Sequence, residues 1–232
     1  MEPARARVVL VPGFTQGAGS WARVVAALDP KVDAVALEVP IGLDFVATAA
    51  AIGAAGGPAT YVGYSMGGRL CLRLALDRPD LVERLVLVSA SPGIAESDAR
   101  AERRAADERL ATEIERDGVD AFLVGWLRQP LFATLAPEDA GLDERRRHCT
   151  VASLTHGLRA LGPGSQEPLW DRLPDLGVDT LLVTGALDAR YTALAGTMSD
   201  AIGARTRVEV VAEAGHAVPL ERPDAVAHLV TA

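Results

Sequence analysis

Short apolar and β-branched runs alternate along this chain with segments whose apolar residues recur at helical spacing. Continuous apolar runs of about five residues are typical of strands buried on both faces of a parallel sheet. The pattern predicts strands at residues 7–11, 32–38, 60–63, 85–89, 180–184 and 207–211, with helices near 21–28, 44–55, 66–77, 191–202 and 223–230. This alternation indicates an α/β fold with a mostly parallel central sheet and helices on both faces.

The alternation stops between Pro92 and about Asp175. This stretch opens with a charged amphipathic helix, ESDARAERRAADERLATEIERDG, that we expect to end at Gly118, followed by a second helix that Pro130 stops. One or two more helices follow, in PEDAGLDERRRHCTVASLTHGLRAL. We therefore expect a helical lid, residues 92–175, inserted into a core made of residues 1–91 and 176–232.

A G-x-S-x-G motif centres on Ser65, between a predicted strand and a predicted helix. A nucleophilic serine at such a junction sits on a sharp turn, and flanking glycines remove the Cβ atoms that would clash. The structural alternative is a glycine-rich turn with an incidental serine. The placement favours a nucleophile.

The partners of such a serine follow it in the order acid, then histidine. Asp188 comes just after the strand 180–184, and His216 lies in a glycine-bearing loop after the strand 207–211. The rival acids all precede the strand and would lie at its wrong end; they are Asp171, Asp175 and Asp179. The other histidines are weaker candidates, because two lie in the lid and one in the last helix. We therefore expect a Ser65–His216–Asp188 triad.

An oxyanion hole needs backbone N–H groups that converge on one oxygen. We expect one from Met66, after the serine, and one from Phe14, in the glycine-rich loop after the first strand. That loop does not match the G-x-G-x-x-G fingerprint, so a dinucleotide site is not expected.

Charge and composition narrow the classes of function and of binding partner that this chain could have. The 232 residues carry a net charge of −8, which does not favour binding to nucleic acid or to an anionic membrane. Cys71 and Cys149 form neither a disulfide framework nor a metal-binding spacing. The opening residues hold no apolar segment of secretory length, so we expect a cytoplasmic protein without membrane insertion, bound metal or cofactor.

The serine motif, the chain order and the lid resemble the α/β-hydrolase fold, and the lid phrases resemble one family within it. SASPGIAESDARAERRAADERLA, GWLRQPLF and LRALGPGSQEPLWDRL are similar to the lid of 2-succinyl-6-hydroxy-2,4-cyclohexadiene-1-carboxylate synthases of menaquinone biosynthesis. The resemblance covers most of the chain. It implies a lyase that eliminates pyruvate from a 5-enolpyruvyl cyclohexene carboxylate, with the triad serine acting as a base.

The resemblance also implies contacts with a small-molecule substrate that carries several carboxylates. It assigns Arg69, Arg103 and Arg147 to the carboxylates, and Tyr64 and Trp126 to the pocket wall. Guanidinium groups suit that task because they form paired hydrogen bonds with carboxylates. The structural alternatives are solvated arginines in the lid and a tryptophan that anchors the lid. The arginine run 145–147 leaves the register of the third arginine open by one residue.

The chain departs from this family at two places. It has Pro12 where the family usually has histidine, and Cys149–Thr150 where the family has an Asn-Asn pair. Two other functions stay open: a serine carboxylesterase or lactonase that forms an acyl-enzyme, and a binding protein on a hydrolase scaffold. The triad fits the lyase and the esterase equally, whereas the arginines and the lid phrases favour the lyase.

Overall fold

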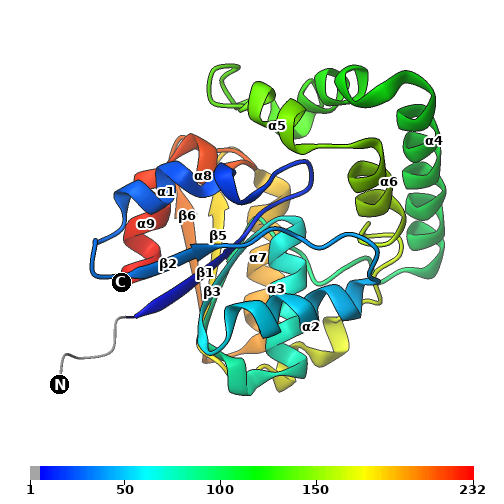
Figure 1. Cartoon of the computed structure of the whole chain (residues 1–232). Coiled ribbons are helices and arrows are strands. Elements are labelled where there is room, and N and C mark those ends of the chain that lie inside the picture. Colours follow the sequence, from blue (N-terminus) through cyan, green and yellow to red (C-terminus); the bar gives the residue numbers. More distant parts are fainter. Residues whose placement is uncertain (1–5) are drawn as a thin grey trace.

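The computed structural model describes residues 6–232 and has one six-stranded sheet at its centre (Figure 1). All neighbouring strands are parallel, in the order β2-β1-β3-β4-β5-β6. The strands are β1 (Arg7–Val11), β2 (Asp33–Ala36), β3 (Ala59–Tyr64), β4 (Val82–Val88), β5 (Thr180–Gly185) and β6 (Thr206–Val211). The α/β class with a parallel sheet is thereby confirmed.

Helices cover both faces of this sheet. On one face lie α2 (Phe45–Gly56), α3 (Met66–Asp77) and α7 (Ala189–Ile202), and on the other lie α1 (Ala22–Ala27), α8 (Val218–Glu221) and α9 (Pro223–Thr231). Side chains alternate along a strand, so Val9 packs into the first core and Val8 and Leu10 into the second. The continuous apolar runs of the sequence are explained by this two-sided burial.

Two strands differ from their predicted bounds by more than one residue. β2 is shorter than expected because it lies at the edge of the sheet, where its residues are only partly buried. β4 begins three residues earlier than expected, at Val82. The added residues pair with the start of β3, and the Arg84 guanidinium donates to the carbonyls of Leu229 and Val230 at the end of α9.

The helical stretch between β4 and β5 stands over one end of the sheet (Figure 1). It contains α4 (Ser97–Leu127), α5 (Leu142–His148) and α6 (Val151–Arg159). Inside α4, Gly118 has φ 84° and ψ 174°, which breaks the helix where the sequence predicts its end. The division into core and lid stays a prediction, and residues 1–5 of the predicted core lie outside the described residues.

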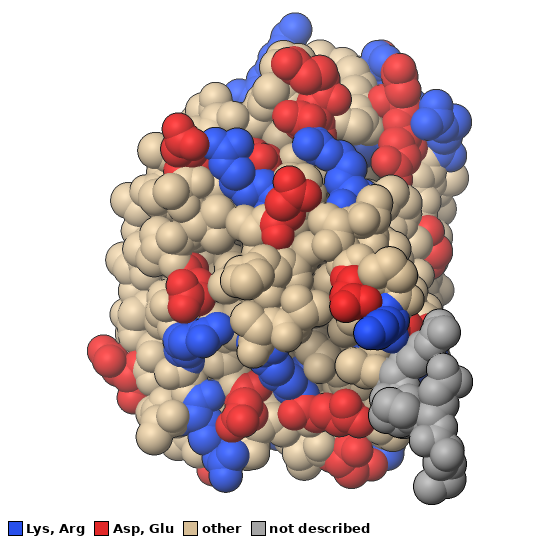
Figure 2. Space-filling view, turned by 90° about the vertical axis from the view of Figure 1, so that its left-hand side faces the viewer, with Lys and Arg blue, Asp and Glu red and all other residues tan. Residues whose placement is uncertain are grey.

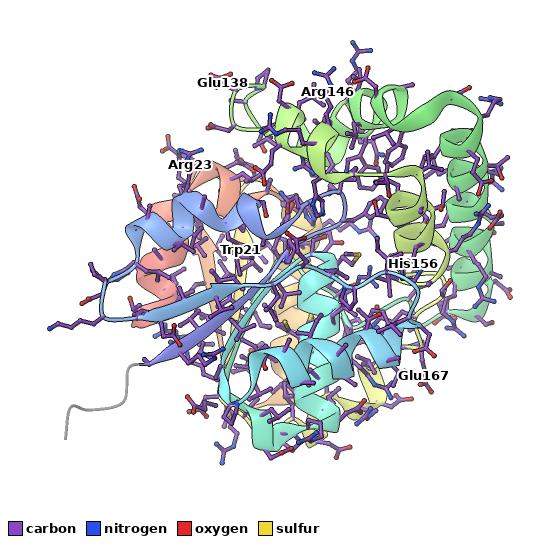
Figure 3. All side chains as sticks on the ribbon, in the orientation of Figure 1. Trp21, Arg23, Glu138, Arg146, His156 and Glu167 are labelled. Carbon is purple, nitrogen blue, oxygen red and sulfur yellow. The ribbon has the colours of Figure 1, made fainter. Side chains whose placement is uncertain are left out.

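The surface carries charges of both signs. On the face shown in Figure 2, basic and acidic side chains are interspersed over most of the area. On the lid, Arg146 points outward and pairs with Asp120 and Asp143, whereas Trp21 lies inside, beneath α1 (Figure 3). Among residues 6–232, no helix combines the length and the apolar character that crossing a bilayer requires.

Candidate active site

Ser65 lies on the tight turn between β3 and α3. Its backbone has φ 51° and ψ −107°, a conformation that non-glycine residues rarely adopt. A Cβ at Gly67 would overlap the carbonyl oxygen of Val11, and one at Gly63 would lie 2.5 Å from the Gly67 oxygen. The two glycines of the motif are therefore required by close backbone approach, as the sequence suggests.

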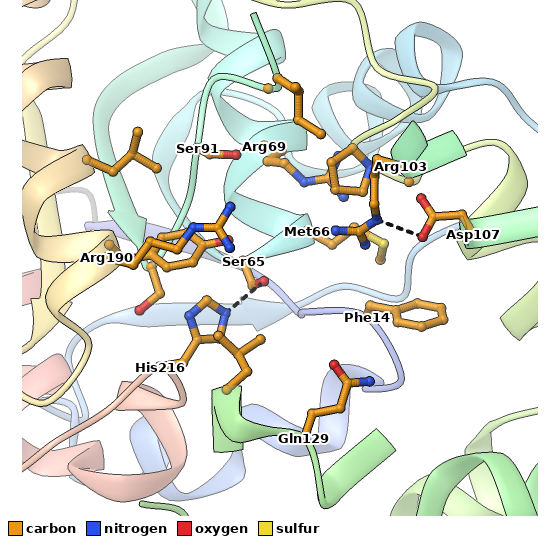
Figure 4. A pocket seen from close by; sticks show the side chains of 18 of the residues that line it. Phe14, Ser65, Met66, Arg69, Ser91, Arg103, Asp107, Gln129, Arg190 and His216 are labelled. Atoms are coloured by element: carbon orange, nitrogen blue, oxygen red, sulfur yellow. Dashed lines mark hydrogen bonds and ion pairs between the residues drawn. The ribbon is translucent and has the colours of Figure 1, made fainter. Parts of the chain in front are cut away.

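His216 lies within hydrogen-bonding distance of both of its predicted partners. Its Nε2 is 3.2 Å from Ser65 Oγ (Figure 4), and its Nδ1 is 2.9 Å from Asp188 Oδ2. The strands end at the same edge of the parallel sheet, so the loops after β3, β5 and β6 bring these distant residues together. This arrangement can pass a proton from the serine to the imidazole.

Asp188 is held in its ionised form. Burial acts to raise its pKa, but hydrogen bonds from His216 and from the Tyr191 backbone N–H outweigh burial and lower the pKa below 3.8. Asp188 also caps the N-terminus of α7, where its charge is favourable. A carboxylate in this position holds the imidazole in one orientation and stabilises the imidazolium that forms.

Two residues that sequence reasoning missed support the histidine. The ring of Tyr191 lies 4.5 Å from the His216 ring, centroid to centroid. Glu221 accepts hydrogen bonds from the backbone N–H groups of Gly215 and Ala217, at 2.8 and 3.0 Å, on either side of His216. The spacing of Tyr191 three residues after Asp188, at a helix N-cap, is the one sequence signal that could have indicated it.

The backbone N–H groups of Phe14 and Met66 stay the predicted oxyanion donors. Met66 is the first residue of α3, where an N–H has no partner within the helix. Neither N–H donates a hydrogen bond to another described residue. Both residues line the cavity beside Ser65, and the Phe14 ring packs edge-on against Trp126 at 5.2 Å.

A cavity of about 750 Å³ opens over Ser65 and His216, between the sheet and the lid. Tyr64, Arg69, Arg103 and Trp126 line it, as the resemblance implies. Sequence reasoning missed other polar residues of the wall, because they come from separate segments and follow no motif: Gln16, Ser89, Asp107, Gln129 and Arg190.

Arg69 is a deeply buried cation of the cavity, with 7% of its surface exposed. Its guanidinium donates to the Gln166 side chain and to the Leu161 carbonyl, both at 2.7 Å. Both acceptors are neutral. Burial lowers the pKa of Arg69 to about 10, which still leaves the guanidinium charged at neutral pH.

Arg103 is tied to the lid by a carboxylate instead. Its Nε donates to Asp107 Oδ1 at 2.8 Å (Figure 4), and no other described residue accepts a hydrogen bond from it. Burial raises the pKa of Asp107 even though Arg103 acts to lower it. The two terminal nitrogens of Arg103 are thus free to bind a ligand in the cavity.

The predicted third arginine is wrong by two positions. Arg147 is exposed on α5 and does not line the cavity, whereas Arg145 is 4% exposed and does. Residues two apart on a helix point to nearly opposite sides, so only one of them can face inward. The sequence could not separate them, because three consecutive arginines stand at this point.

No metal-binding group stands out in the part of the chain that the structure describes. Across residues 6–232, His, Cys, Asp and Glu side chains form no group of three or more that could hold a metal ion.

The chain is similar to proteins of known name. The chain is 36% identical over 166 residues to a Bacillus subtilis (strain 168) protein provisionally named as a 2-succinyl-6-hydroxy-2,4-cyclohexadiene-1-carboxylate synthase; the match covers 70% of this chain and 60% of that protein. It is 28% identical to the synthase of that name from Serratia proteamaculans (strain 568), over 97% of this chain and 92% of the relative. The first of these matches thus spans less than two thirds of the relative's length.

Solved structures show the same fold. MenH from S. aureus superposes with a TM-score of 0.91 at 23% identity, covering 98% of this chain and 92% of that one. The enol-lactonase from Burkholderia xenovorans LB400 superposes with a TM-score of 0.80 at 21% identity, over 98% and 90% of the two chains. A profile of the alpha/beta hydrolase family matches residues 8–229. With this match over nearly its whole length, and the serine turn of the fold at Ser65, the chain belongs to the alpha/beta hydrolase family.

Proposed function

We propose that the chain is a cytoplasmic lyase that eliminates pyruvate from a 5-enolpyruvyl cyclohexene carboxylate and yields 2-succinyl-6-hydroxy-2,4-cyclohexadiene-1-carboxylate. The observation that carries the proposal is a single cavity that holds both the Ser65–His216 pair and several arginines. Buried cations bring no benefit for a neutral ester, whereas they suit a substrate with several carboxylates. The names of the relatives support the same reaction.

The charge balance of the cavity fits an anionic substrate. Its wall carries four arginines and two carboxylates, which leaves a surplus of two positive charges: Arg69, Arg103, Arg145 and Arg190 against Glu96 and Asp107. The net charge of −8 is spread over the whole chain. Salt screens such distant charges over about 10 Å, so the arginines in the cleft dominate the field that the substrate meets.

The elimination begins with proton transfer. His216 accepts the Ser65 proton, and the Ser65 oxygen removes a proton from the substrate carbon next to a carbonyl. The N–H groups of Phe14 and Met66 stabilise the negative charge that develops on that carbonyl oxygen. The electron pair then forms a ring double bond as the C–O bond to the enolpyruvyl group breaks, and the departing enolpyruvate takes up a proton to become pyruvate.

A serine carboxylesterase or lactonase is the second candidate. The 3.2 Å contact between His216 Nε2 and Ser65 Oγ also suits attack of the serine on an ester carbonyl. The two reactions differ in their products, because only the lyase releases pyruvate without adding water.

The deciding experiment compares two substrates on purified protein. Pyruvate release from the enolpyruvyl substrate is followed by coupling to lactate dehydrogenase, and hydrolysis of p-nitrophenyl acetate is followed by absorbance. We expect fast pyruvate release that Ser65→Ala abolishes, with feeble ester hydrolysis. Efficient ester hydrolysis without pyruvate release would replace the lyase by the esterase.

A further inference from the structure

The residue that follows Phe14 has an unusual backbone. Thr15 has φ 70°, in the left-handed region, and only 5% of its surface is exposed. A β-branched residue rarely adopts this conformation, so the surrounding structure must hold it there. Thr15 is bonded to Phe14, whose N–H is a predicted oxyanion donor, so the position of Thr15 restrains the loop that carries this N–H.

Two side chains from the lid hold Thr15. Arg145 Nη1 donates to the Thr15 hydroxyl, and Cys149 Sγ donates to the Thr15 carbonyl at 3.3 Å. Arg145 is itself held by a hydrogen bond from its Nε to the Ala140 carbonyl, at 2.8 Å. Burial raises the pKa of the Cys149 thiol to about 11, so the thiol keeps the proton that it donates.

The loop and α5 also fit closely in shape. A Cβ at Gly17 would lie 2.7 Å from the His148 ring, and a Cβ at Gly19 would overlap the Glu144 carboxylate. A larger residue at Gly17 would have to displace the His148 ring, whereas at Gly19 the flexible Glu144 side chain could turn aside. Gly17 thus leaves room for the α5 side chains that lie next to this loop.

The charge of Arg145 has no carboxylate partner. Among the described residues it forms no ion pair, and both of its acceptors are neutral oxygens. A buried cation without an anionic partner destabilises a fold, so a residue of this kind indicates a functional role. Its position supplies one, because it lies at the wall of the cavity and contacts the loop of the oxyanion donor.

We propose that Arg145 and Cys149 are positioning residues that hold Thr15 and so keep the Phe14 N–H directed at the developing oxyanion. This inference rests on the proposed function, in which Phe14 and Met66 form the oxyanion hole. The lid therefore contributes to the chemical step as well as to substrate binding. A role for these residues in carboxylate binding alone is the alternative that the test separates.

The test removes each hydrogen bond while keeping the shape. Thr15→Val keeps the β-branch and loses only the hydroxyl acceptor, and Cys149→Ala loses the thiol donor. Matched controls are Thr180→Val, at the opposite end of β5, and Cys71→Ala, inside α3; both residues are buried and remote from the loop. Thr15→Ser is the rescue variant.

Three readouts apply to every variant: turnover and KM for pyruvate release, turnover of p-nitrophenyl acetate, and affinity for phenylboronic acid. The boronate bonds to Ser65 and places an oxygen in the oxyanion hole, whatever the natural substrate is. Complete loss of an oxyanion donor lowers kcat by about 10²–10³-fold. Misdirection of one donor should lower kcat by roughly 10–100-fold, weaken the boronate by a similar factor and leave KM within about twofold.

The proposal is overturned if the variants raise only KM for the carboxylate substrate, or if they leave boronate affinity unchanged. It is also overturned if the control variants lose as much turnover as Thr15→Val and Cys149→Ala. Failure of Thr15→Ser to restore turnover also counts against it. If the wild-type protein binds boronate but releases no pyruvate, the lyase is refuted and the boronate and ester readouts still decide the positioning role. A wild-type protein that is inactive in all three readouts overturns both proposals.

Discussion

Replacing Arg69 by alanine tests whether the buried cation serves the substrate or the fold. Two of its five N–H donors bind the Leu161 carbonyl and the Gln166 side chain. The remaining donors are available to a ligand, and the guanidinium carbon lies 5.5 Å from the centre of the Phe45 ring. Alanine removes the charge and all five donors together.

The size of the effect follows from the number of hydrogen bonds lost. A hydrogen bond to a charged group contributes about 1.5–3 kcal/mol, so one or two bonds to a carboxylate contribute about 2–5 kcal/mol. At 1.36 kcal/mol per factor of ten, kcat/KM for pyruvate release should fall roughly 30-fold to several thousandfold. Hydrolysis of a neutral ester should change by less than about threefold, because no carboxylate is bound in that reaction.

The assay measures kcat/KM for both substrates, with Arg73→Ala as the matched control. Arg73 lies one turn further along α3, pairs with Asp77 and Glu167, and does not line the cavity. Thermal unfolding is measured in parallel, since Arg69→Ala leaves two acceptors unpaired and should lower stability by about 1–2 kcal/mol. An equal loss for both substrates would show that Arg69 supports the fold of the site and would refute its role in carboxylate binding.

Three further outcomes are expected. Asp188→Asn should lower turnover about a thousandfold or more. The pKa of Asp188 in the folded protein lies below the ordinary value of 3.8, so its carboxylate stabilises the fold above that pH. This stabilisation is lost as the pH falls through the folded pKa. Urea unfolding of the Asn variant, measured over a series of acidic pH values, should not show that loss. Gly67→Ala, whose Cβ would overlap a carbonyl of β1, should lower the unfolding free energy by about 3 kcal/mol or more, whereas Gly125→Ala, in open space on α4, should leave it within about 1 kcal/mol. In kinetic assays, Arg145→Ala should lower turnover, while Arg147→Ala should match the wild type; equal effects would contradict their placement on α5.

The order and type of the elements were predictable because each signal is local. Parallel strands buried on both faces need continuous apolar runs, and these stand out against helical spacing. The turn at Ser65 needs small neighbours, and Gly63 and Gly67 mark it. Asp188 and His216 were identifiable because catalytic residues of this fold follow the ends of strands, which a sequence reveals once the strands are known.

The sequence predicts the lid as a set of helices, but it does not predict which side chains of those helices face the cavity. The resemblance implies Arg147, whereas Arg145 lies inward, because periodicity inside a charged helix does not show which arginine meets the cavity. Gln166, Tyr191 and Glu221 support the site through contacts with segments far away in the chain or by backbone hydrogen bonds, and no motif marks such contacts.

The sequence by itself thus determined the strands, the turn at the nucleophile and the chain order of the triad, because these depend on short-range sterics and on burial. Tertiary structure alone decided how the lid meets the loop after β1. The contacts of Arg145 and Cys149 with Thr15 span 130 and 134 residues of the chain. Such a contact depends on the packing of two separate elements, which local preferences do not encode.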